Sequence, residues 1–501
     1  MTSLALLIDF GSTFTKVTAV DIDRPRLIGR AQSPSTIDRD VTDGLLAALS
    51  QLRTVSPELS GLPRDDLDGL ERVFVRASSS AAGGLKIVVV GLVPGLTVQA
   101  ANAAALGAGA KVVGTFGFKL NDDAMAEIEA LEPDMVLLTG GTDGGDRATI
   151  VHNAARIARA PLMVPVIAAG NARAAGDIAR AFGAAGKDVI IVDNVMPAAG
   201  IVRPRAAQAA IRELFMQRIT DAKGLDRIKD HVPVVLPTPM AVQKAAELGA
   251  EGLDGIPGCG ELMLVDVGGA TTDVYSIGDG QPRGKDMIPA SLPEPHSKRT
   301  VEGDLGLRFN ARTILARAGA DRFWEDFAAT FPEIDADRAE VLDFVAAVSA
   351  ETGRVPGCDW QFAADAVMAR TAVDIAIQRH VGSAEPYFSS GGTVDLVSGK
   401  DMTQTPLLIG TGGVFTYNPF AERVLTGSGP GPDHRRVLRP IRPRIFTDRD
   451  YVLHAIGLLA DSHAGVAMDL FQAHFPAAGP PGLHADHAHH GAMAGDDTCC
   501  A

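Results

Sequence analysis

The chain has 501 residues, 46% of them hydrophobic, which is enough for about three domains at roughly 150 residues each. Its net charge of −15 argues against a general nucleic-acid binder, because phosphate contacts need a basic face. No apolar run reaches the about 20 residues of a membrane-spanning helix, and the segment MTSLALLIDF lacks the basic n-region and cleavage site of a secretory signal. We therefore expect a cytoplasmic protein that contacts neither nucleic acid nor membrane.

A short apolar strand ending in an acid opens the chain. The segment LLIDF is followed by the small polar residues Gly11, Ser12 and Thr13, after which residues 14–20 resume strand-type alternation. This pattern predicts a β-hairpin whose glycine turn exposes backbone N–H groups that can cradle phosphate oxygens. Lys16 is placed to return a positive charge to the same phosphates.

The same pattern returns in the middle of the chain. Asp266 follows Asp9, and Asp273 follows Lys16, by one interval of 257 residues without a gap. The second turn is again built from small residues, which are Gly268, Gly269, Ala270, Thr271 and Thr272. Two facing hairpins of this kind predict a nucleotide site in which Asp9 and Asp266 hold Mg²⁺ largely through water. Asp273 is then free to orient or deprotonate an attacking water.

The alternative is a pair of purely structural hairpins. A structural turn requires no acid before it, no hydroxyls within it and no charge after it, so two matched copies favour the nucleotide site.

The segments DFGSTFTK and DVGGATTD resemble the two phosphate motifs of the ATPase superfamily of actin, Hsp70 and the sugar kinases. The resemblance implies two RNase H-like halves that close on ATP. In that account Asp9, Lys16, Asp266 and Asp273 carry the hydrolysis.

Three later segments resemble further parts of the superfamily pattern. PLLIGTGGVF is similar to the adenosine motif, through Gly410, Thr411, Gly412 and Gly413. VEGDLG resembles an acidic turn that places Glu302, with Asp304 beside it, near the metal. YVLHAIGLLA resembles a helix whose small residues, Ala455 and Gly457, pack closely between the halves. Taken singly, each of the last two segments is better explained as an ordinary helix.

Longer stretches resemble one family of this superfamily, the GlmL or MutL accessory proteins associated with glutamate mutase, which are unrelated to the mismatch-repair protein of that name. The resemblance covers most of residues 1–460. The stretches that carry it include ASSSAAGGLKIVVVGLVPG, LLTGGTDGGD, IAAGN, DNVMP and VEGDLG. The resemblance implies ATP/ADP and Mg²⁺ as cofactors, and subunits of an adenosylcobalamin-dependent mutase as partners. It implies an accessory factor that remodels or reactivates that mutase, and leaves the oligomeric state open.

Between the hairpins, short apolar strands alternate with Ala-rich helical segments at spacings near 25 residues. This rhythm predicts a flavodoxin-like parallel α/β domain. Many cobalamin-binding domains share that shape, but the motif DxHxxG is missing, and His152 is expected at the surface or as a cap. Any contact with cobalamin is therefore expected to be indirect. Asp143 and Asp146 leave a ligand role open for GGTDGGD, against a purely structural glycine loop.

The predicted fold class is thus α/β, a two-lobed actin-like ATPase fold with an inserted parallel α/β domain. The expected parts are the start of lobe I, the insertion, the return to the ATPase fold, lobe II, and a disordered tail with histidines and cysteines, at residues 1–84, 85–200, 201–260, 261–474 and 475–501. His380 is expected to be a surface or packing residue.

Three other functions share this fold. A small-molecule kinase would use Asp273 to deprotonate a substrate hydroxyl, and a scaffold would bind ATP without hydrolysing it. An electron-delivering activator needs a cysteine-held iron–sulfur cluster. Cys259 and Cys358 stand alone, so the sequence disfavours that third function.

Overall fold

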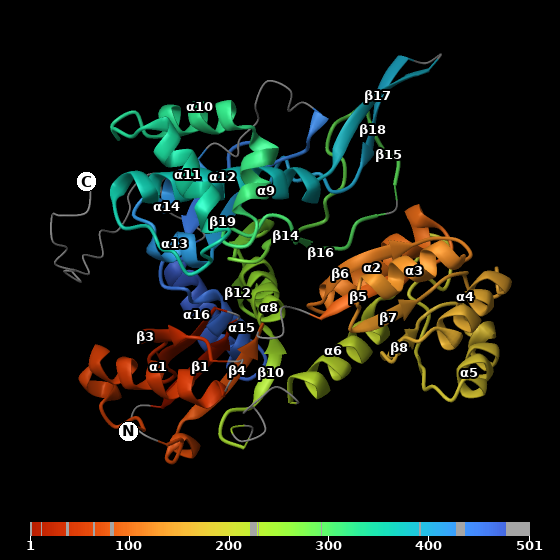
Figure 1. Cartoon of the computed structure of the whole chain (residues 1–501), viewed down its shortest axis with the longest axis horizontal. Coiled ribbons are helices and arrows are strands. Elements are labelled where there is room, and N and C mark those ends of the chain that lie inside the picture. The colour runs from red at the N-terminus through yellow and green to blue at the C-terminus, as the bar shows by residue number, and fades with distance from the viewer. Residues whose placement is uncertain are drawn as a thin grey trace.

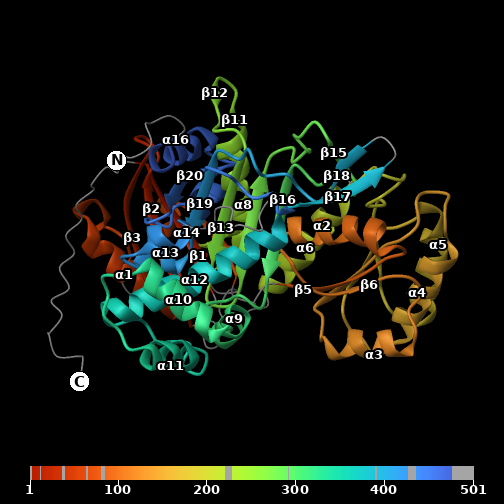
Figure 2. The same cartoon turned by 90° about the horizontal axis from the view of Figure 1, so that it is seen from above.

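A computed structural model describes residues 3–11, 13–36, 40–63, 66–80, 85–220, 228, 230–291, 293–389, 392–426 and 436–476. Ser12 and residues 477–501, most of the expected disordered tail, lie outside these residues. The tail is expected to begin at residue 475, but Phe475 is buried in an apolar cluster. The described elements form two lobes with an α/β domain beside them (Figures 1 and 2).

Lobe I is built on a five-stranded sheet with the strand order β10-β4-β1-β2-β3. The first three strands form an antiparallel meander, β4 lies parallel to β1, and β10 lies parallel to β4. The strands are β1 (Leu4–Phe10), β2 (Phe14–Asp21), β3 (Arg26–Pro34), β4 (Phe74–Ser79) and β10 (Val234–Pro237). Helix α1 (Val41–Val55) packs on this sheet, with Asp40 accepting a hydrogen bond from the N–H of Thr42 as its N-cap.

Lobe II repeats the arrangement with the order β20-β19-β13-β14-β16. Its strands are β13 (Leu262–Val267), β14 (Thr272–Ile277), β16 (Ser297–Glu302), β19 (Leu407–Thr411) and β20 (Arg444–Thr447). Parallel and antiparallel neighbours match those of lobe I strand for strand. The two lobes therefore share one topology, as the duplicated hairpin predicts.

Helices cover the outer face of the lobe II sheet and fill its core. The longest described helix, α12 (Asp359–His380), is buried along much of its length against β13 and β14. Its neighbours are α9 (Ala311–Ala318), α10 (Ala320–Thr330), α11 (Arg338–Val348), α13 (Gly413–Tyr417) and α14 (Ala421–Leu425). His380 is buried between the hydroxyls of Thr300 and Ser276, so it is a packing residue rather than a surface one.

Two helices lie between the lobes. Helix α8 (Thr238–Glu251) follows β10, and α15 (Leu453–Leu459) follows β20, so each is the helix after the fifth strand of its lobe. Both share one apolar cluster with residues of β1 and β13. A Cβ atom on Gly457 would lie 1.8 Å from the carbonyl oxygen of Ala241 on α8, so only glycine permits this approach. The predicted close packing of Gly457 and Ala455 between the halves is confirmed. Helix α16 (Ala464–His474) closes the described chain.

The inserted domain is a wholly parallel sheet of order β6-β5-β7-β8-β9. This is the flavodoxin-like order, with its first strand next to the second and third. The strands are β5 (Lys86–Val90), β6 (Lys111–Phe116), β7 (Met135–Leu138), β8 (Val166–Ala168) and β9 (Ile190–Ile191). The helices are α2 (Gln99–Gly107), α3 (Asp122–Ala130), α4 (Ala148–Arg159) and α5 (Ala175–Ala184), and α6 (Arg205–Thr220) leads back to lobe I. The predicted fold class is confirmed.

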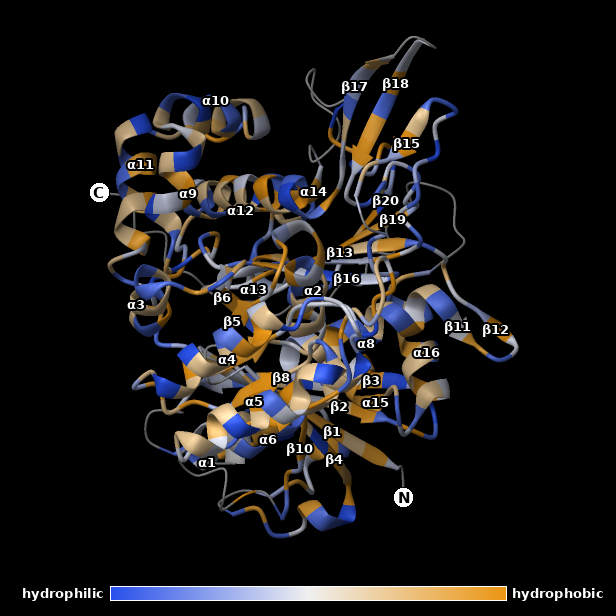
Figure 3. Cartoon of the chain, turned by 90° about the vertical axis from the view of Figure 1, so that its right-hand side faces the viewer, coloured by the Kyte–Doolittle hydropathy of each residue, from blue (hydrophilic) through white to orange (hydrophobic). Residues whose placement is uncertain are grey.

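Hydropathy follows this layering. In Figure 3, α4 and α5 carry both orange and blue, as helices with one buried face do. On α4 the buried residues include Ile150, Ala154 and Ile157, which recur at helical spacing. No helix among the described residues is long and apolar enough to cross a membrane.

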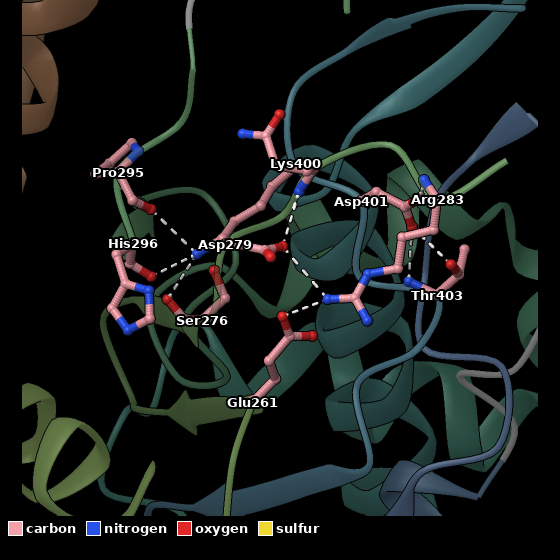
Figure 4. Close-up of polar contacts among 10 residues, drawn as sticks. Glu261, Ser276, Asp279, Arg283, Pro295, His296, Lys400, Asp401 and Thr403 are labelled. Atoms are coloured by element: carbon pink, nitrogen blue, oxygen red, sulfur yellow. Dashed lines mark hydrogen bonds and ion pairs between the residues drawn. The ribbon is translucent and has the colours of Figure 1, made fainter. Parts of the chain in front are cut away.

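A small sheet of β15 (Met287–Pro289), β18 (Gly392–Ser398) and β17 (Ser383–Ser389) projects from lobe II (Figure 1), and a short hairpin joins β11 (Gly252–Leu253) to β12 (Ile256–Pro257). Figure 4 shows the buried amine of Lys400, just after β18, donating to the carbonyl oxygens of Ser276, Pro295 and His296 at 2.7–3.1 Å. Burial, with the nearby Lys298 charge, lowers the pKa of Lys400 to about 7. Lys400 therefore ties this small sheet to the end of β14.

Candidate functional site

The two glycine turns share a matching backbone hydrogen bond. The N–H of Gly11 donates to the carbonyl of Phe14 at 3.0 Å, and the N–H of Gly268 donates to that of Thr271 at 2.9 Å. Across the ladders, Asp9 is opposite Lys16, and Asp266 is opposite Asp273. Residues directly opposite each other in an antiparallel pair project from the same face of the sheet. Each hairpin therefore presents its acid and its partner side by side.

Asp9 is almost fully buried and well satisfied. It accepts hydrogen bonds from the Thr238 hydroxyl at 2.6 Å, the Lys16 amine at 3.2 Å and the Tyr451 hydroxyl at 3.2 Å. Burial alone would raise the pKa of Asp9, but Lys16, His454 and Thr238 together outweigh it and hold the pKa below its usual value. Asp9 is thus a stable carboxylate at neutral pH.

Asp266 has different surroundings. Its carboxylate accepts no hydrogen bond from the residues that the structure describes. Burial and the facing charge of Asp273 raise its pKa to about 7, with Asp9 adding to the repulsion and Lys16 opposing it. Because the charges of Asp9 and Lys16 act on Asp266, the two hairpins lie close together. The excess of carboxylates over cations here favours a bound cation.

Asp273 is held by an arginine. Its Oδ1 lies 3.3 Å from Nη2 of Arg299, a buried side chain of β16. Burial raises the pKa of Asp273, against the lowering effect of Arg299. The second carboxylate oxygen forms no ion pair with the described residues, so it can accept a proton from water or from a substrate hydroxyl.

The second glycine turn has backbone N–H groups that are available to a ligand. The N–H groups of Gly269, Ala270 and Thr271 donate to no acceptor in the described part of the chain, whereas the Gly268 and Gly269 carbonyls are taken by Leu307, Arg308 and Phe309. Successive free N–H groups in a turn make an anion-binding concavity. The Thr272 hydroxyl instead donates to the Leu305 carbonyl and is buried, so it serves the fold. Thr13, in the first turn, is exposed.

The predicted adenosine segment comes directly beside Asp266. Strand β19 pairs with β13 and ends at Thr411, after which Gly412 adopts φ +106° and α13 begins at Gly413. A Cβ atom on Gly412 would lie 3.0 Å from Oδ1 of Asp266. Gly410 lies against the Phe415 ring. The strand, glycine turn and helix therefore place backbone without side chains beside Asp266, in the acidic centre formed by Asp9, Asp266 and Asp273.

Glu302 is not brought to this centre. Val301 is opposite Asp273 in the ladder, so Glu302, one residue later, leaves the sheet on the other face. Its carboxylate is paired with Arg379, which also binds Asp304. No group of three or more metal-ligating side chains occurs among the described residues. The residues present fit Mg²⁺ held through water by Asp9 and Asp266, without Glu302.

Several residues of the site carry no motif and were not predicted. Thr238 and Asp448 each follow the fifth strand of a lobe. The first binds Asp9, and the second accepts a hydrogen bond from Thr411 at 2.9 Å. Tyr451, with φ +51°, places its ring 3.9 Å from the Lys16 amine. Thr238 and Asp448 could have been found from the sequence as polar residues that directly follow the fifth strand of each lobe, before or at the start of the interlobe helix.

His454, a residue of α15, lies close to Asp9. Its Nδ1 is 2.9 Å from the Tyr451 carbonyl, whereas its buried Nε2 has no partner among the described residues. Burial lowers the pKa of His454 to about 4, so the ring is neutral.

The loops at the carboxyl edge of the inserted sheet bind one another. Asp143 accepts from the Ala172 N–H at 2.9 Å and from the Asn194 amide at 3.0 Å, and Asp146 accepts from the N–H of Thr149, in the first turn of α4. The amide of Asn171 donates to two carbonyls of the same loop. These contacts favour the structural interpretation of GGTDGGD. His152 is exposed, as predicted, and its Nε2 lies 3.1 Å from the Leu120 carbonyl.

Solved structures with a related chain path include nucleotide-free acetone carboxylase, with 14% identity, coverage of 92% of this chain and 70% of that chain, and a TM-score of 0.38. The activator of 2-hydroxyisocaproyl-CoA dehydratase from Clostridium difficile with bound ADPNP has 9% identity, coverage of 94% and 97%, and a TM-score of 0.32. Glycerol dehydratase reactivase has 11% identity, coverage of 92% and 100%, and a TM-score of 0.34. With TM-scores below 0.5, these likenesses support no inference about chemistry.

The sequence comparisons are more specific. The model of the MutL protein family matches residues 5–475. Protein MutL of Clostridium tetanomorphum is 37% identical over 462 residues, which span 91% of this chain and 96% of that protein. The chain belongs to the MutL protein family.

Proposed function

We propose that this protein binds Mg·ATP between its two lobes, hydrolyses it slowly, and reactivates an adenosylcobalamin-dependent mutase of the glutamate mutase type. The observation that carries the nucleotide site is the pair of matched hairpins, in which Asp9 faces Lys16 and Asp266 faces Asp273. Membership of the MutL family supports the accessory role. Any contact with cobalamin itself is indirect in this proposal.

The side chains divide the work. Asp9 and Asp266 would hold Mg²⁺ through water, and the ion would neutralise charge on the β- and γ-phosphates. The Lys16 amine and the free N–H groups of the second turn bind phosphate oxygens. Asp273, kept in place by Arg299, orients the attacking water and takes its proton. A carboxylate with a raised pKa is better suited to accept a proton near neutral pH than an ordinary one.

Remodelling needs the lobes to move. ATP and ADP shift such an equilibrium only if they bind the open and closed arrangements with different affinities. The elements between the lobes are the helix pair α8 and α15. Turnover gated by such a motion is slow.

The test is phosphate release from Mg·ATP by the wild type and by Asp273→Ala, each with and without an adenosylcobalamin mutase inactivated by turnover. We expect slow release that the mutase stimulates, that Asp273→Ala abolishes, and that accompanies recovery of mutase activity. Asp143→Ala, which alters a carboxylate of the inserted domain, is the control and should behave as wild type.

Other outcomes identify other functions. Transfer of phosphate to an added sugar or acid would support a kinase with Asp273 as its base. Binding of ATP without release under any condition would support a scaffold.

A further inference from the structure

The arginine that holds Asp273 also contacts the inserted domain. Nη1 of Arg299 donates to the carbonyl oxygen of Leu106 at 3.1 Å and to that of Ala110 at 3.3 Å, while Nη2 reaches Asp273. Leu106 lies in the last turn of α2, and Ala110 directly precedes β6. Figures 1 and 2 both show α2 beside β16. One buried guanidinium therefore spans two domains.

This geometry suits arginine in particular. The last carbonyls of a helix lack intrahelical partners and carry the negative end of its dipole, so they attract a cation. The planar fork of arginine presents donors in two directions, whereas a lysine ammonium is a point charge that serves one side well. The side chain of Arg299 is 3% exposed, so water does not compete for these contacts.

A second cation comes from the same turn. Lys111, the first residue of β6, lies near enough to Asp273 for its charge to oppose the rise in the pKa of Asp273. Gly303 makes room for it, since a Cβ atom there would lie 2.8 Å from the Lys111 amine. Arg299, through its hydrogen bonds, and Lys111, through its charge, thus both connect Asp273 to the turn between α2 and β6.

We propose that Arg299 is a positioning residue that ties Asp273 to the inserted domain, so that the position of the α2–β6 turn sets the rate of ATP hydrolysis but not the affinity for ATP. The inference rests on the proposed ATPase. It assigns the inserted domain a regulatory connection to the hydrolytic carboxylate. A simpler role, in which Arg299 only neutralises Asp273, requires no particular position of the turn.

Two kinds of variant separate these roles. Arg299→Gln removes the charge that pairs with Asp273 and shortens the side chain that reaches the inserted domain. Arg299→Lys keeps the charge but lacks the planar guanidinium that binds both sides. Gly109→Ala leaves Arg299 and Asp273 intact, but it strains the turn, because Gly109 has φ +88° and donates its N–H to the Leu106 carbonyl. Matched controls are Gly186→Ala, with φ +67° and open space around it in the same domain, and Arg439→Gln, a buried arginine paired with Asp374.

We expect Arg299→Gln to lower kcat about 100-fold, the size of effect that misplacing a catalytic group produces, with KM for ATP within about twofold of wild type. Arg299→Lys should recover part of the loss, Gly109→Ala should lower kcat less but in the same direction, and both controls should keep the wild-type kcat. Wild-type kcat in Gly109→Ala or in Arg299→Gln would overturn the proposal.

Hydrogen exchange separates failure of this inference from failure of the proposed ATPase. Binding of a non-hydrolysable ATP analogue should change exchange at residues 106–111 in the wild type and not in Arg299→Gln. If the wild type binds nucleotide but releases no phosphate, the ATPase proposal fails. The exchange result then decides whether the nucleotide site and the turn between α2 and β6 are coupled, and unchanged exchange at 106–111 in the wild type would refute the coupling.

Discussion

Asp9 and Asp266 occupy equivalent positions in the two hairpins, yet replacing each by asparagine should have opposite effects on stability. Asp9 accepts three hydrogen bonds, one of them from the Lys16 amine. Asp266 faces Asp273 and accepts no hydrogen bond within the described residues. In the absence of Mg²⁺, Asp9→Asn removes a stabilised charge, whereas Asp266→Asn removes a repelled one.

The pKa of Asp266 sets the magnitude. It is raised from 3.8 to about 7, and about three pH units correspond to about 4 kcal/mol. Asp266 is partly exposed, so we expect about 2 kcal/mol. A raised pKa in the folded state stabilises the protein below about pH 4, and this contribution is lost as the pH rises to about 7. The gain in Asp266→Asn should therefore be present at pH 8 and vanish near pH 4.

For Asp9 the sign reverses. Its lowered pKa contributes stability that is present above the ordinary value of 3.8 and is lost on acidification below it. Thermal unfolding in EDTA measures both variants. At pH 8 we expect the Tm of Asp266→Asn to rise by about 2 °C and that of Asp9→Asn to fall. Equal losses of Tm in both variants at pH 8 would refute this account of the acidic centre.

Three other substitutions probe the close contacts. Gly412→Ala puts a side chain where φ is +106° and a Cβ meets a backbone carbonyl at 2.3 Å. It should weaken Mg·ATP binding at least about tenfold by calorimetry; an affinity equal to that of the wild type would contradict this. Gly457→Ala should lower the free energy of unfolding by about 1–3 kcal/mol, because its methyl meets a carbonyl of α8 at 1.8 Å, and an unchanged Tm would count against this packing. Tyr451→Phe removes the hydroxyl bonded to Asp9 and should cost about 1 kcal/mol in denaturant titrations, whereas a cost near zero would mean that the bond contributes nothing.

Local patterns explain what the sequence could predict. A hairpin is set by its turn residues and strand alternation, so the pairing of Asp9 with Lys16 and of Asp266 with Asp273 follows once the turns are recognised. Because the hairpin occurs twice, each copy can be compared with the other. Gly412 could be placed for the same reason, since a strand running into glycines specifies its own turn.

The remaining contacts depend on packing between distant segments. Thr238 and Tyr451 reach Asp9 from 229 and 442 residues away, and Arg299 meets the inserted domain across more than 180 positions. No local pattern encodes such meetings. Glu302 illustrates the reverse case, because a motif in the expected place still points away from Asp273 when the pleat puts it on the other face of the sheet.

The central claim is that the two hairpins form one site that hydrolyses ATP. The most direct measurement is calorimetric binding of Mg·ATP combined with single-turnover phosphate release, for the wild type and for Asp273→Asn. We predict one ATP bound per chain in both proteins, with similar Kd, and phosphate release by the wild type alone. Loss of binding in Asp273→Asn, or equal release by the two proteins, would contradict the role assigned to Asp273.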